Sequence, residues 1–125
     1  MIPFNIKFEA GIPIYEQLIY AVKKAIVSGQ LNTGDRFPSV RALSLELKIN
    51  PNTVQKAVAK LVNDKLLEIR PGIGCMVAAA REATEEQRRE ILSVEIERLV
   101  VEAKQLRLGE REIINAVQQH WKNLK

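Results

Sequence analysis

Residues 38–53 read PSVRALSLELKINPNT, a pattern that predicts two short helices meeting at a sharp corner. Ser39 can cap the first helix, because its hydroxyl can accept a hydrogen bond from an unpaired N–H of the first turn. Asn50 can cap the second helix in the same way, and Pro51 suits its first position, where no N–H is needed. Two capped helices joined by a tight turn are typical of a helix-turn-helix.

The second of these helices divides into an apolar face and a polar face. The apolar positions recur at helical spacing and are Val54, Ala57, Val58, Leu61 and Val62. The outward positions carry short polar or basic side chains, namely Asn52, Thr53, Gln55, Lys56 and Lys60. Such side chains can reach base edges and phosphates in a major groove of DNA. This helix is therefore the expected recognition helix.

The segment before the corner predicts an arm and a first helix. Residues 2–8 alternate loosely between apolar and polar side chains, which indicates a short strand or an extended arm. From Pro13 onward apolar residues recur at helical spacing, and Gly29 is placed to end that helix. Residues 30–37 are then a connector with a turn at Gly34 and Asp35.

The segment after the corner predicts a β-hairpin. Two extended runs, residues 66–70 and 75–77, flank a glycine-rich turn. Three helices followed by a hairpin is the order of a winged helix, in which the hairpin tip lies beside the recognition helix against the DNA. The tip carries Arg70 and Gly72, and a glycine has no side chain to keep the backbone from a phosphate.

Residues 78–125 predict a separate helical segment. Thr84 and Gln87 form a capping box that opens a long helix, and Gly109 separates it from a last helix. A heptad-like seam of apolar residues runs along both helices: Leu92, Ile96, Leu99, Ala103, Leu106, Ile114, Val117, Trp121 and Leu124. Because the connection is short, the helices should fold back as an antiparallel hairpin. Two helices cannot bury these stripes alone; either the winged helix or a second copy must cover them, and the heptad spacing favours a second copy.

Charge and length limit the possible functions. The net charge is +4, and residues 1–77 hold ten Lys and Arg against six Asp and Glu, whereas residues 78–125 hold nine of each. The basic excess thus lies in the half that contains the helix-turn-helix, which supports a nucleic-acid partner, although a small surplus also serves solubility. At 125 residues the chain excludes a large enzyme core.

Other classes of protein lack their sequence signals. No apolar run reaches the roughly 18 residues of a membrane span, and the first residues do not resemble a signal peptide, so a cytoplasmic protein without membrane association is expected. The single cysteine, Cys75, and the single histidine, His120, offer no metal-ligand spacing. No catalytic triad and no phosphate-binding glycine loop is present, so we expect neither an enzyme nor a cofactor.

Five short motifs follow one another along the chain: PIYEQL (13–18), GQL (29–31), GDRFPSVRAL (34–43), NPNTVQKA (50–57) and RPGIG (70–74). In order and spacing they resemble the GntR family of bacterial transcriptional regulators. The short two-helix C-terminal segment resembles the YtrA subfamily, which implies a dimer formed by the C-terminal helices and, commonly, control of transporter operons. Met76 departs from the aromatic residue usual in the family, but a flexible thioether can fill that position.

The motifs also supply candidate DNA contacts. The resemblance implies that Arg41 contacts DNA, and its guanidinium fork suits a guanine or a phosphate. Asn52 and Gln55 can read adenine, and Thr53 fits a phosphate better. The full set of candidates is Arg36, Ser39, Arg41, Asn50, Asn52, Thr53, Gln55, Lys56, Arg70 and Gly72. Capping alone explains Asn50, a solvated helix face explains Lys56 nearly as well as DNA contact does, and Tyr15 and Tyr20 are expected to be packing residues.

The sequence therefore predicts a mainly α-helical chain with a small β-hairpin. Residues 1–77 are the predicted winged helix-turn-helix, and residues 78–125 the predicted antiparallel two-helix dimerisation domain. The expected function is a sequence-specific regulator, more specifically a homodimeric repressor that binds double-stranded DNA at an inverted-repeat operator. The alternative is a nonspecific, nucleoid-type or adaptor protein with a winged helix. The operator, its genes and any small-molecule effector are not encoded in these patterns, and residues 78–125 are too few to enclose a drug-sized pocket in one subunit.

Overall fold

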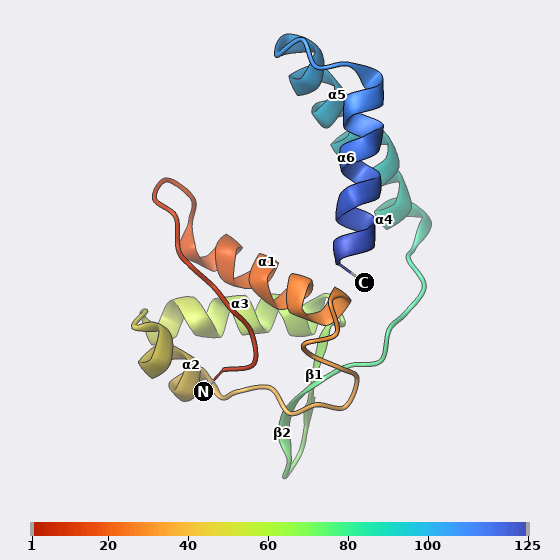
Figure 1. The fold of residues 1–125 in the computed structure, drawn as a ribbon. Helices are drawn as coiled ribbons and strands as arrows, with labels where there is room; N and C mark the ends of the chain where they lie inside the picture. Colours follow the sequence, from red (N-terminus) through yellow and green to blue (C-terminus); the bar gives the residue numbers. More distant parts are fainter. Residues whose placement is uncertain (1, 125) are drawn as a thin grey trace. The chain divides into compact units, whose positions relative to one another are not determined.

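The computed structural model describes residues 2–124, which form two compact units that divide between Ala80 and Arg81 (Figure 1). The first unit contains α1 (Ile14–Val27), α2 (Val40–Leu47), α3 (Pro51–Asn63), β1 (Leu67–Arg70) and β2 (Gly74–Val77). The second contains α4 (Glu85–Arg89), the π-helical segment η1 (Glu90–Glu95), α5 (Ile96–Gln105) and α6 (Glu110–Asn123). The expected mainly helical chain with one hairpin is confirmed. Within the described residues, no helix is both long and apolar enough to cross a membrane.

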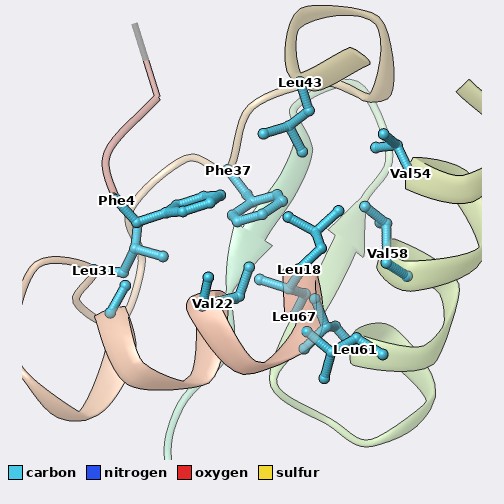
Figure 2. Close-up of a cluster of buried hydrophobic side chains, with 14 of the residues drawn as sticks. Phe4, Leu18, Val22, Leu31, Phe37, Leu43, Val54, Val58, Leu61 and Leu67 are labelled. Atoms are coloured by element: carbon cyan, nitrogen blue, oxygen red, sulfur yellow. The ribbon is translucent and has the colours of Figure 1, made fainter. Parts of the chain in front are cut away.

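The core of the first unit lies between α1, α3 and the hairpin, and α2 packs against α3 (Figure 2). Apolar residues recur every three or four positions in α1 and α3, so each helix turns one apolar face inward. The largest side chains that are almost wholly buried are Leu18, Val22, Leu31, Leu43, Val54, Leu61 and Leu67. This core fixes the corner between α2 and α3 to a rigid base.

The N-terminal arm is anchored on the same core. Residues 2–8 form no strand, so the extended-arm alternative holds, and their burial alternates from Phe4 to Phe8. The ring of Phe4 is buried and stacks on Phe37, with 6.1 Å between ring centroids and 9° between ring planes (Figure 2). At its beginning the arm is tied to α2, because the Ile2 N–H donates to a Glu46 carboxylate oxygen at 3.0 Å.

The hairpin pairs β1 and β2 in antiparallel register, with Leu67 opposite Val77 on the buried face. A third segment extends it, because Arg36 forms an isolated bridge with Met76. The connector is also hydrogen-bonded to β2 on either side of this bridge. On one side, the Phe37 N–H donates to the Cys75 carbonyl at 2.8 Å. The sequence pattern predicts the hairpin but not this third segment. The connector's turn spans residues 32–35 and includes the expected Gly34 and Asp35.

The second unit begins with the expected capping box. Thr84 Oγ1 accepts from the Gln87 N–H at 3.0 Å, and the Gln87 side chain accepts in return from the Thr84 N–H at 2.9 Å. The expected long helix runs from Glu85 to Gln105, with the π-helical segment η1 in place of α-helical turns between α4 and α5. Wider π-type turns rotate the face of the helix before η1 relative to α5. Four residues, 106–109, then connect α5 to α6.

Candidate nucleic-acid interface

The corner between α2 and α3 has the capping that its sequence predicts. Ser39 Oγ accepts from the Ala42 N–H at 3.0 Å, and Asn50 Oδ1 accepts from the Asn52 N–H at 2.7 Å. Both caps satisfy N–H groups that the first turn of a helix leaves unpaired. The helix-turn-helix therefore follows from local sequence signals.

A buried residue that the sequence pattern did not predict stabilises the turn between α2 and α3. Among the described residues, Ser44 is the polar residue that is buried. Its hydroxyl donates a hydrogen bond to the Ile49 carbonyl at 2.9 Å. Between them Lys48 adopts a left-handed conformation, with φ of 57°, and its N–H donates to the Ser44 carbonyl. A serine in the last turn of a helix can bond the chain that follows, which is the signal that could have identified it.

The candidate DNA contacts lie on the surface of the first unit. Arg36, Ser39, Arg41, Asn50, Asn52, Gln55, Lys56, Arg70 and Gly72 are exposed, and Thr53 is half-buried. Ser39 and Arg41 lie at the start of α2, whereas residues 50–56 form the start of α3 and its first two turns. Arg36 lies beside β2 through its bridge with Met76, so it belongs with the hairpin rather than with α2.

The hairpin tip is a tight turn in which Gly72 is conformationally required. The Ile73 N–H donates to the Arg70 carbonyl at 3.0 Å, and Gly72 has φ of 79°. With Pro71 before it, this is the pattern of a type II turn, whose third position favours glycine. Arg70 is paired with Glu68 at 3.2 Å, so part of its charge is compensated within the wing. Burial raises the pKa of the nearby Cys75 thiol.

The basic residues of α3 have partners of different kinds. Lys56 Nζ lies 4.8 Å from the centroid of the Tyr15 ring, which projects from the first turn of α1. Lys60 instead pairs with Asp64, the residue directly after α3, at 3.4 Å. The packing expected of Tyr15 is confirmed, since its side chain is half-buried against the core. The same expectation is wrong for Tyr20, which is 63% exposed.

The second unit presents an apolar groove, hereafter the α5–α6 groove, of about 640 Å³. Five of the expected seam residues line it: Ile96, Leu99, Ala103, Ile114 and Val117. Leu92, Leu106, Trp121 and Leu124 do not, and Leu92 lies beside Glu85 and Arg88 instead. The other apolar residues that line the groove are Val100, Leu108 and Ile113, and its polar lining residues are Lys104, Glu110 and Gln118.

Comparison with known proteins relates most of the chain to one family. Residues 14–77 match the sequence profile described as bacterial regulatory proteins, gntR family. The chain is 33% identical over 95 residues to the HTH-type transcriptional repressor YtrA of Bacillus subtilis, and the match covers 75% of this chain and 73% of that protein.

Solved structures share the architecture of both units. YtrA of Sulfolobus acidocaldarius, a GntR-family transcription factor, aligns with a TM-score of 0.56 at 28% identity and covers 96% of this chain and 97% of its own. A transcriptional antiterminator from Listeria monocytogenes aligns with a TM-score of 0.87, over 97% of this chain and 91% of its own. Its identity of 24% makes it evidence for the fold alone.

Proposed function

Because the chain belongs to the GntR family of bacterial regulatory proteins, with a YtrA-like architecture, we propose that it is a homodimeric repressor that binds an inverted-repeat operator. At the level of the family it is a DNA-binding transcriptional regulator and not an enzyme. The observation that carries the proposal is the exposed polar face of α3, which begins at a capped corner on a rigid core.

The exposed residues fit distinct roles in this proposal. Arg41 makes a bidentate contact with a guanine or a phosphate, and Asn52 and Gln55 read base edges in the major groove. Thr53 and Lys56 contact phosphates, while Arg36, Arg70 and the Gly72 backbone approach the DNA from the wing. Ser39 and Asn50 act first as helix caps, so their side-chain oxygens are already engaged.

A second copy of the chain is the proposed cover for the α5–α6 groove. Val117 in the groove is 45% exposed, and Trp121, one turn further along α6, is 80% exposed. Burial of apolar surface of this kind is what drives stable association of helical hairpins. A symmetric dimer would also present two α3 helices to half-sites about one helical turn apart.

Binding of the promoter upstream of its own gene tests sequence-specific regulation. Fluorescence anisotropy at one fixed salt concentration should give an affinity at least about a thousandfold higher for this promoter than for a random duplex. Equal affinities would support the alternative, a nucleoid-type or adaptor protein, because phosphate contacts alone carry no sequence information.

Light scattering at micromolar concentration tests the dimer. We expect the mass of a dimer for the native chain and of a monomer for Val117→Glu, which places a charge in the α5–α6 groove. Val101→Glu is the matched control, because Val101 is 61% exposed on α5 and does not line that groove. A monomeric native chain would refute the proposed dimer.

The YtrA-like architecture also supports a transporter operon as the target of this regulator, which would act in the cytoplasm. Expression of a reporter driven by the promoter of the adjacent genes should rise when the gene for this protein is deleted and fall when that gene is restored. Unchanged expression would contradict repression of those genes.

A further inference from the structure

Among the exposed cations that the structure describes in the first unit, Lys56 is the one with an aromatic partner. Its ammonium lies 4.8 Å from the Tyr15 centroid, inside the roughly 6 Å over which a ring face attracts a cation. The two residues are 41 positions apart and come from α1 and α3, which pack against each other. The pair therefore links the proposed recognition helix to the helix behind it.

We propose that Tyr15 is a positioning residue for DNA binding, which holds the Lys56 ammonium at one edge of α3 where it donates to a DNA phosphate. The inference rests on the proposed DNA contact of α3. A lysine side chain is flexible and loses much rotamer freedom when it is fixed by a ligand. A ring that already confines the ammonium in the free protein removes part of that loss.

The geometry allows the ring and a phosphate to share the ammonium. An ammonium has three donors, and a ring face occupies only one side of it. Tyr15 is half-buried and packs against the core, so the ring is itself fixed, whereas the Lys56 side chain is exposed to an incoming phosphate. Lys60 lacks this freedom, because it is paired with Asp64 at 3.4 Å.

A double-mutant cycle separates positioning from simple support of the fold. Tyr15→Leu should weaken DNA binding by about two- to fivefold, the size of an exposed cation–π interaction, and Tyr15→Phe should restore it because the ring face remains. In a Lys56→Gln background, Tyr15→Leu should have no further effect. A structural role alone predicts the same loss in both backgrounds, and that result would overturn the proposal, as would equal or tighter binding by Tyr15→Leu.

Two controls make each outcome decisive. Tyr20→Leu removes an exposed tyrosine from the same helix and should leave the affinity unchanged. The Lys56 ε-CH₂ protons should show an upfield ring-current shift in the free protein that Tyr15→Leu abolishes and Tyr15→Phe retains. An unshifted resonance in the native chain contradicts the pair without any reference to DNA.

The cycle should be measured on both a random-sequence duplex and the promoter of the protein's own gene. A phosphate contact contributes to both, since it carries no sequence information. Lys56→Gln should also reduce the slope of log affinity against log salt by about one on either duplex. If the promoter is not preferred but the coupling persists, the proposed operator function fails while the role of Tyr15 stands; an unchanged salt slope rejects the phosphate contact.

Discussion

Phe4 and Phe37 stack with nearly parallel rings, 6.1 Å between centroids, and thereby fasten the N-terminal arm to the connector that precedes α2. Both rings are buried in the cluster of Figure 2. Phe37 is also bonded to β2 through its N–H. The stack and this hydrogen bond together join three segments that are distant in sequence: the arm, the connector and β2.

Phe4→Ala should lower the free energy of unfolding by about 3 kcal/mol, because it empties a buried aromatic site. The value is expected at the lower end for aromatic truncations, since the end of an arm can detach without unfolding the remainder. Urea denaturation followed by circular dichroism measures it. Phe8→Ala, at a half-buried position of the same arm, is the control and should cost less; equal costs would contradict the anchoring role of Phe4.

The three helix caps and the hairpin were predictable because their signals are local. Ser39, Asn50 and Thr84 each accept the bond expected from an N–H two or three residues ahead. Contacts between distant segments carry no such signal, and so the bridge between Arg36 and Met76 was not predicted. The sequence places Arg36 in the connector, but only pairing with β2 assigns it to the wing.

The second unit shows the same limit in another form. The apolar spacing predicts its helices and the short connection correctly, yet nothing in residues 90–95 signals a π-helical segment. Similarly, the pattern of α3 identifies Lys56 as outward-facing but not its pairing with Tyr15, which depends on how α1 packs.

Ser44→Ala should destabilise the corner between α2 and α3 by about 1 kcal/mol, because the Ile49 carbonyl loses its bond to a buried hydroxyl. A looser corner should also weaken DNA binding, since α3 would be held less firmly. Thermal unfolding and anisotropy measure the two effects. Ser28→Ala is the matched control, as its hydroxyl bond at 3.4 Å to the Ala25 carbonyl is longer and lies at the end of α1. Equal losses of stability and affinity from both substitutions would argue against a special role for Ser44.

Arg41→Ala should weaken binding to the promoter by about 1–3 kcal/mol and relax the preference for it, if the guanidinium reads a base. The side chain is exposed at the start of α2, so its removal should leave stability nearly unchanged. Arg98→Ala removes the same charge from the second unit, where Arg98 is paired with Glu95 and 75% exposed, and should preserve the preference. A uniform loss on promoter and random duplex would instead assign Arg41 to a phosphate.

Gly72→Ala should strain the wing turn by about 1–2 kcal/mol, because a φ of 79° is unfavourable for a residue with a Cβ. The added methyl group meets no atom within 4 Å, so the cost arises from the backbone and not from a clash. We expect weaker DNA binding with little change in helix content. Gly72→Asn should recover part of the loss, since asparagine tolerates this conformation. Identical behaviour of the two variants would indicate that the side chain itself obstructs the DNA.

The attachment of the arm to α2 should depend on pH. The Ile2 N–H bond to the Glu46 carboxylate stabilises the charged form, which lowers the pKa of Glu46 below its usual value. A lowered pKa means that the contact is intact at neutral pH and is lost only as the pH falls through that lowered value. The amide shift of Ile2, followed by NMR, should therefore change at a pH below the ordinary glutamate pKa of about 4.3. Glu46→Gln cannot titrate and should abolish the transition, whereas a midpoint at the ordinary value would show that the contact is not formed in solution.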